Sequence, residues 1–148
     1  DCMAPALVIG HAIGRIGCQL AGDGDWGAVS DVPWAMAYPN AIIGWPYPEG
    51  VRVHPAPIYE CLAYATVFGI LWSIRKRSYP AGTLFWLYLV LAPLARFGIE
   101  FVRINPVFVF GLTQAQIFSL ALVAVGLWRL SVARPGGAVP AARRSGKR

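Results

Sequence analysis

Three long apolar runs restrict the folds available to this chain more than any other feature of the sequence. They cover residues 57–74, 83–102 and 113–130, and each is close to the length of about 20 residues that an α-helix needs to cross a bilayer. Only 14% of the residues are charged, against about 25% in a typical soluble domain. The sequence therefore predicts an integral membrane protein and argues against a soluble globule or a disordered chain.

A shorter apolar stretch, Met3–Ile13, precedes these runs. It is too short to span a bilayer, so we expect it to be the end of a helix that begins before this sequence does. The predicted fold is all-α, a polytopic transmembrane helix bundle of about three full spans plus this truncated first helix. Residues 1–130 would form the membrane domain, and residues 131–148, rich in Gly, Pro, Ala and Arg, would be a disordered basic tail.

The distribution of charge predicts the orientation of the bundle. Residues 129–148 hold six basic residues and no acid, and Arg75-Lys76-Arg77 follows the first full span. Lys and Arg are enriched in cytoplasmic loops, so we expect both regions, and the C-terminus, in the cytoplasm. A basic tail can bind nucleic acid, but no base-stacking aromatic residues accompany this one. We therefore expect no nucleic-acid partner.

Residues 22–55 differ in composition from the spans. This segment is rich in Gly, Pro, Asp and aromatic residues, and Trp and Tyr are typical of the membrane–water interface. The predicted topology places it on the outer face. The three cysteines, Cys2, Cys18 and Cys61, show neither metal-ligand spacing nor a disulfide framework, and we expect no metal and no cofactor.

Ionisable residues near the outer ends of the predicted spans are the main candidates for a functional site. Charged side chains in a membrane are costly and usually line a polar interior. Arg96, Glu100 and Arg103 follow one another at spacings of four and three, so they would share one helix face. The complete set near this depth is Arg15, His54, Glu60, Arg96, Glu100 and Arg103.

Two interpretations of these charges remain open at the level of sequence. In the structural one, ion pairs hold the bundle together, Arg96 with Glu100 and Arg15 with Glu60, because a desolvated carboxylate needs a cationic partner. In the functional one, three arginines outnumber two glutamates, and the surplus positive charge binds an anion. The planar guanidinium group suits phosphate, so the ligand would be a phospholipid. His54 is either a general base or an interfacial structural residue.

Four short motifs in order resemble those of the bacterial prolipoprotein diacylglyceryl transferases. They are GRIG at residues 14–17 with the acidic, glycine-rich stretch ending at Trp26-Gly27, HPAPIYE at 54–60, RFGIEFVR at 96–103 and GLTQAQ at 111–116. The second and third are similar to the family patterns HP-x-x-[LI]-YE and RF-x-x-EF-x-R. The resemblance covers most of residues 10–130. Each motif alone is weak evidence for the family, but the four motifs in order are specific.

The resemblance implies an enzyme of the bacterial cytoplasmic (inner) membrane with its active site towards the outer face. It would transfer a diacylglyceryl group from phosphatidylglycerol to the lipobox cysteine thiol of a prolipoprotein, forming a thioether and releasing glycerol phosphate. Its partners would be phosphatidylglycerol, the prolipoprotein signal peptide and membrane lipids. Arg15 and Arg96 match the essential arginines of the family and would stabilise the leaving phosphate. The resemblance also implies a substrate-binding set that comprises Arg15, Asp23, His54, Tyr59, Glu60, Arg96, Glu100 and Arg103.

Two departures from the family pattern keep alternatives open. Cys18 stands where the family commonly has Asn, and the histidine proposed as the family's base lies in an upstream motif with no counterpart here. His11 lies too close to Arg15 to match it. The alternatives are a non-catalytic phospholipid-binding homologue and a small anion transporter subunit. A transporter would favour an internal repeat, and none is visible in the sequence.

Overall fold

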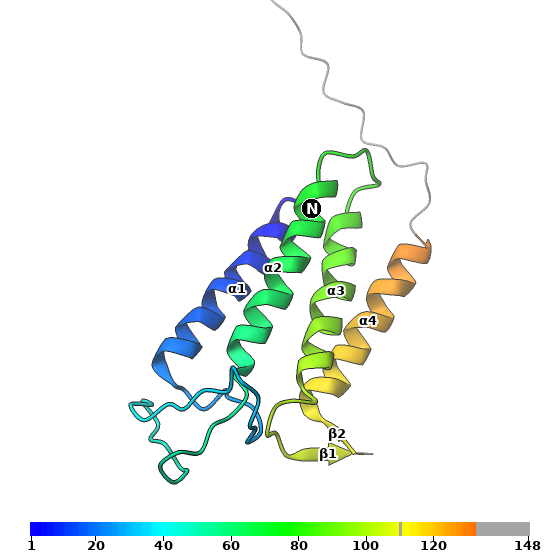
Figure 1. The fold of residues 1–148 in the computed structure, drawn as a ribbon. Coiled ribbons are helices and arrows are strands. Elements are labelled where there is room, and N and C mark those ends of the chain that lie inside the picture. The colour runs from blue at the N-terminus through cyan, green and yellow to red at the C-terminus, as the bar shows by residue number, and fades with distance from the viewer. Residues whose placement is uncertain (110, 133–148) are drawn as a thin grey trace, which may run out of the picture.

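The computed structural model describes residues 1–109 and 111–132, and within them the chain is helical (Figure 1). Its helices are α1 (Met3–Ala21), α2 (Ala56–Ile74), α3 (Thr83–Ile99) and α4 (Gln114–Val132). A small antiparallel hairpin of β1 (Val107–Val109) and β2 (Leu112–Thr113) precedes α4. Helix α1 packs mainly on α2, α4 packs mainly on α3, and contacts between α2 and α3 join the two pairs.

Two of the described helices are long and apolar enough to cross a membrane. These are α2 and α4, each of 19 residues, with mean hydropathies of 1.3 and 1.6, whereas α3 is apolar but has 17 residues. Only 17% of the apolar window of α4 is buried within the protein. Side chains such as Phe118 and Trp128 are therefore exposed as they would be towards lipid. The helical membrane fold is supported, and the number of spans stays a prediction.

Helix α1 continues well beyond the apolar stretch that predicted it. It runs to Ala21 and ends at Gly22, whose φ of 62° is left-handed and whose N–H bonds to the Cys18 carbonyl. Glycine adopts this conformation without strain, which is why it commonly ends helices. The prediction stopped at Ile13 because Gly14, Arg15, Gly17 and Gln19 interrupt the apolar run without interrupting the helix.

Helix α3 ends earlier than the prediction of Val102. It runs through Pro93 to Ile99, and the N–H of Glu100 bonds to the Arg96 carbonyl at 3.1 Å. The chain then turns because the loop after α1 binds its backbone. The Val102 carbonyl accepts the Ala28 N–H at 2.9 Å. Arg103 consequently lies beyond the helix and not on its face, although its Nε lies 4.0 Å from Glu100 Oε2.

The bundle has two chemically different ends (Figure 1). The turn between α2 and α3, with Arg75-Lys76-Arg77, lies at the same end as the last turn of α4, which contains Arg129. Residues 22–55 and the hairpin lie at the opposite end. The basic tail falls largely on residues 133–148, outside the described residues, so its predicted disorder and the domain boundary stay predictions.

Small residues allow the helices to approach closely. Ala4, Val8 and Ala12 of α1 pack against Val67 and Leu71 of α2 in the main core cluster. A glycine serves the same purpose between α3 and α4. A Cβ built on Gly126 would lie 2.6 Å from Val90 Cγ2 and 3.2 Å from the Trp86 carbonyl oxygen.

Replacement of Gly126 by leucine is expected to separate α3 from α4. Overpacking of this kind lowers the free energy of unfolding by about 1–3 kcal/mol, measured by denaturant unfolding in detergent. Gly69→Leu is the matched control, because a Cβ at Gly69 of α2 meets nothing within 4 Å. Equal losses in the two variants would contradict the close contact at Gly126.

Candidate functional site

A single buried carboxylate organises the polar interior of the bundle. Glu60, in the second turn of α2, is 0% exposed. It pairs with Arg15 of α1, with Arg96 of α3 and with Arg103, whose Nη1 lies 3.1 Å from Glu60 Oε1. Removing a partner from a buried ion pair is strongly destabilising. Glu60 therefore holds guanidinium groups from three segments in one place.

Asp25, in the loop after α1, is a second bridging carboxylate. One of its oxygens pairs with Arg15 and the other with Arg103. Burial opposes ionisation of this carboxyl, but the guanidinium groups of Arg103 and Arg15 outweigh it and hold its pKa below the usual 3.8. Asp25 is therefore ionised at neutral pH. The sequence interpretation missed it and selected Asp23.

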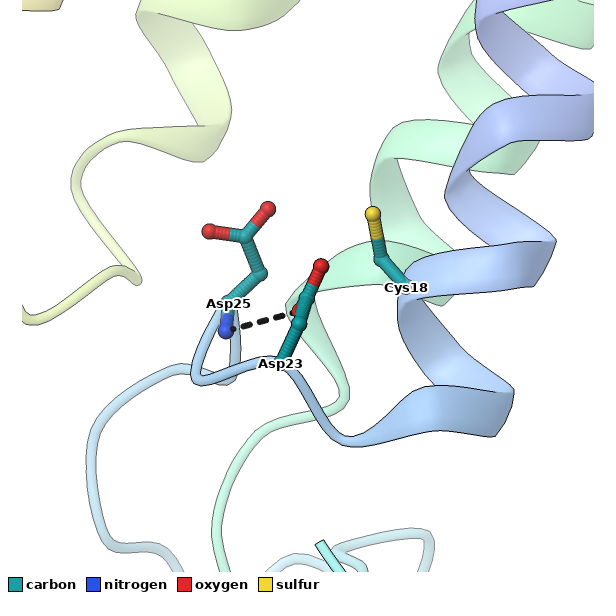
Figure 2. A group of neighbouring side chains, drawn as sticks. All are labelled: Cys18, Asp23 and Asp25. Atoms are coloured by element: carbon teal, nitrogen blue, oxygen red, sulfur yellow. Dashed lines mark hydrogen bonds between the residues drawn. The ribbon is translucent and has the colours of Figure 1, made fainter. Parts of the chain in front are cut away.

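Asp23 is exposed and lies outside this network. Its carboxylate accepts the backbone N–H of Asp25 at 3.3 Å, as Figure 2 shows. The sequence offered two acids separated by one glycine, and the path of the loop decides which of them reaches the arginines. Glycines at positions 22 and 24, with φ of 62° and 91°, set that path.

Glu100 is the third carboxylate and ties the start of α4 to the site. It pairs with Arg96 at 3.2 Å and accepts hydrogen bonds from Asn105 Nδ2 at 2.5 Å and Thr113 Oγ1 at 2.8 Å. Thr113 and Gln116 form a reciprocal capping box. The Thr113 N–H donates to Gln116 Oε1 at 3.0 Å, and the Gln116 N–H donates to Thr113 Oγ1 at 3.3 Å. The roles of Asn105 and Thr113 depend on contacts across the turn, which no local pattern in the sequence predicts.

Positive and negative charges are equal in this arginine–carboxylate network. Its members are Arg15, Arg96, Arg103, Asp25, Glu60 and Glu100. The predicted surplus of positive charge is wrong, because it counted two glutamates and left out Asp25. The two ion pairs of the structural interpretation, Arg15 with Glu60 and Arg96 with Glu100, are confirmed. The net charge of the network therefore gives no reason to expect an anion, and the direction in which the arginines face becomes the relevant observation.

Two of the arginines face a cavity of about 330 Å³. Arg15 and Arg96 line it together with Tyr64, whereas none of the three carboxylates of the network does. The remaining lining comes from one face of α1, namely Gly10, His11, Gly14 and Cys18. The carboxylates thus hold the guanidinium groups from behind and leave them open towards the cavity, where they could bind a phosphate.

A second cavity of about 290 Å³ adjoins the first between α3 and α4. It shares His11, Tyr64 and Arg96 with the cationic cavity, and its other walls are mostly apolar, including Leu89 and Phe118. The two spaces together are cationic at one end and apolar at the other. This combination suits an anionic amphiphile such as a phospholipid.

His54 and Tyr59 form a neighbouring group with Trp34. His54 Nδ1 lies 3.0 Å from the Tyr59 hydroxyl, which also accepts a hydrogen bond from Trp34 Nε1 at 2.7 Å. The His54 carbonyl accepts the Gly27 N–H at 2.8 Å, and a Cβ on Gly27 would lie 2.8 Å from His54 Cβ. These contacts fasten the loop of residues 22–55 to the start of α2. A substrate-binding role for His54 and Tyr59 stays a prediction.

Cys18, Asp23 and Asp25 could be mistaken for a metal site. Their ligand atoms lie within 4.8 Å of one another (Figure 2). Both oxygens of Asp25, however, pair with arginines, and Arg15 Nη1 lies 3.7 Å from Cys18 Sγ. A cation here would have to displace guanidinium groups, so we assign no metal to this cluster.

Comparisons of the sequence with known proteins point to one family. The family model described as prolipoprotein diacylglyceryl transferase matches residues 1–132. A relative from Nitratidesulfovibrio vulgaris (strain DP4) is 38% identical over 143 residues, 93% of this chain and 50% of its own length. One from Dehalococcoides mccartyi (strain CBDB1) is 37% identical over 127 residues, which cover 86% and 48% of the two chains.

A third relative, from Pseudomonas aeruginosa (strain LESB58), is 35% identical over 133 residues, which cover 86% of this chain and 47% of its own. All three are named phosphatidylglycerol–prolipoprotein diacylglyceryl transferase. The chain spans about half the length of these relatives. The match over residues 1–132 includes every member of the arginine–carboxylate network, and the chain belongs to the prolipoprotein diacylglyceryl transferase family.

Proposed function

We propose that this chain provides the donor-lipid site of an enzyme that transfers a diacylglyceryl group from phosphatidylglycerol to the lipobox cysteine of a prolipoprotein. The observation that carries the proposal is the cavity lined by Arg15 and Arg96, with their carboxylate partners outside it. The adjoining apolar cavity gives space for hydrocarbon. The names of the relatives supply the donor and the acceptor.

In the proposed reaction the acceptor sulfur attacks the glycerol carbon that bears the phosphate ester. The C–S bond forms while the C–O bond breaks, and the electron pair of the broken bond remains on the departing glycerol phosphate. The thiol proton is released to solvent. The donor phosphodiester has one negative charge and the departing monoester develops a second. Arg15 and Arg96 therefore bind the transition state more tightly than the donor, which is the requirement for catalysis.

The carboxylates contribute by fixing the arginines before the lipid arrives. Glu60 pairs with both Arg15 and Arg96, and Glu100 holds Arg96 from a second side. Donors that are already oriented towards developing charge need no reorganisation during the reaction. Glu60 and Glu100 are positioning residues in this account, and Arg103 acts through Glu60 and Asp25.

The proposed location is the bacterial inner membrane, with the basic end of the bundle in the cytoplasm. Arg75-Lys76-Arg77 and the end of α4 lie together at that end, as the positive-inside rule favours. The arginine–carboxylate network lies towards the opposite end, near residues 22–55. The donor would therefore come from the outer leaflet, on the side where exported prolipoproteins emerge.

The test uses the full-length protein, purified in detergent, with phosphatidylglycerol and a lipobox peptide. We expect the peptide mass to rise by one diacylglyceryl group and glycerol phosphate to appear in equal amount. A peptide with Ser in place of the lipobox cysteine is the matched control and should gain no mass. If the cysteine peptide gains none while phosphatidylglycerol remains bound, the transferase proposal fails. A non-catalytic phospholipid-binding homologue would then be the better description.

A further inference from the structure

Three polar side chains at the junction of the two cavities are not used by the arginine–carboxylate network. The ring of His11 lies 5.5 Å from that of Tyr64 and 6.2 Å from that of Tyr88, measured between centroids. His11 and Tyr64 line both cavities, and Tyr88 lines the apolar one. Within residues 1–109 and 111–132, no protein group hydrogen-bonds to the His11 imidazole or to either hydroxyl.

On each helix these residues lie further from the loop end than the residue that belongs to the arginine–carboxylate network. On α1, Arg15 is four residues nearer to the loop end than His11, about 6 Å along the axis. On α2, Glu60 precedes Tyr64 by the same spacing. On α3, Arg96 is eight residues beyond Tyr88, about 12 Å. The arginines therefore lie nearest the loop end, and His11 and Tyr64 lie further in. Tyr88 lies furthest in along α3, beside the apolar side chains of α3 and α4 that line the second cavity.

A glycerophospholipid in the outer leaflet also has its charged group outermost and its hydrogen-bond acceptors below it. Its phosphate is outermost, its two ester carbonyls lie just below, and its acyl chains follow. Ester carbonyls accept hydrogen bonds and donate none, whereas an imidazole N–H and a phenol O–H are donors. None of these three donors is a buried unsatisfied group, and His11 is exposed, so all three are free to bind an ester carbonyl.

We infer that His11, Tyr64 and Tyr88 form a subsite for the glycerol-ester region of the donor, so that the site selects a diester lipid over a diether lipid. This inference rests on the proposed function in one respect, namely that the donor is a phospholipid bound with its phosphate at Arg15 and Arg96. It adds residues that neither the family motifs nor the ion-pair network includes. It also assigns them a chemical preference.

The experiment compares dioleoyl phosphatidylglycerol with its dialkyl ether analogue, which retains the phosphate and the chains but lacks both carbonyls. Binding to the full-length protein in detergent is measured for each lipid. We expect the wild type to prefer the diester by about tenfold, the effect of one or two hydrogen bonds. His11→Phe, which keeps the ring contacts, should lose most of this preference by weakening diester binding alone.

Two further variants separate the subsite from a merely structural role. His11→Gln keeps a donor and should recover part of the preference. Tyr88→Phe should reduce it, whereas Tyr79→Phe, in the turn between α2 and α3, should leave it unchanged. Equal binding of the two lipids by the wild type would overturn the inference. So would an equal loss for both lipids in His11→Phe.

The transfer assay distinguishes this inference from the proposed function. Preference for the diester without transfer to the peptide would support the subsite and overturn the transferase. Transfer with equal kcat/KM from diester and diether donors would support the transferase and overturn the subsite.

Discussion

Arg96→Lys in the full-length protein is expected to lower kcat/KM for transfer by about 10²–10³-fold, the usual effect of losing a donor that stabilises developing charge. The substitution keeps the positive charge but loses the planar fork. Arg96 uses that fork to pair with Glu60 and Glu100 while it faces the cavity. A single ammonium group cannot keep both carboxylates and also bind the phosphate in bidentate fashion.

The measurement is peptide mass gain at several lipid concentrations, with the unfolding midpoint recorded for each variant. Arg52→Lys is the matched control, because Arg52 is an exposed arginine of the loop of residues 22–55 and takes part in none of the described ion pairs. It should retain wild-type activity. Wild-type transfer by Arg96→Lys, or a loss no greater than that of the control, would remove Arg96 from the phosphate site.

Glu60→Gln is expected to lower the free energy of unfolding by about 3–5 kcal/mol, the usual penalty when one partner of a buried ion pair is removed. The side chain is fully buried and pairs with Arg15, Arg96 and Arg103. A neutral amide of the same shape leaves these guanidinium groups with less compensation. The loss would be measured by denaturant unfolding in detergent.

A second substitution tests the electrostatic reason for that loss. In Glu60→Gln combined with Arg103→Gln, one cation is removed with the anion, and the double variant should be more stable than the sum of the two single effects predicts. Glu49→Gln replaces an exposed glutamate in the loop and should be nearly neutral. If Glu60→Gln resembles Glu49→Gln, the central role of Glu60 is wrong.

The helices could be predicted well because apolar runs and the turn at residues 79–82 are local features. The predicted helix ends are wrong where the end is not marked by a local feature. Helix α3 stops at Ile99 because the loop after α1 binds the backbone of Val102, and no local signal marks that contact. Helix α1 extends past Ile13 because a helix with a polar face does not need an unbroken apolar run.

In the candidate site, too, residues that follow a general rule were predicted, and residues selected by the fold were missed. Charge within a membrane must be paired, and this rule can be applied to a sequence. Five predicted residues accordingly meet in one network, namely Arg15, Glu60, Arg96, Glu100 and Arg103. Asp25 was missed because loop conformation selects between it and Asp23. His11 was compared only with the family's upstream histidine, and it lies too close to Arg15 in sequence to match that residue. On a helix, however, a spacing of four is what brings two side chains to the same cavity.

The shared use of Glu60 has a consequence for how the protein enters the membrane. Its charge is balanced only when α1, α2 and the end of α3 are together, and charged residues are unfavourable in a helix that inserts alone. Each of these helices is thus less favourable in lipid alone than in the bundle, where its charged residue is paired. Biogenesis should therefore proceed by joint release of the helices from the insertion machinery, and a bundle lacking one of them should be retained or degraded.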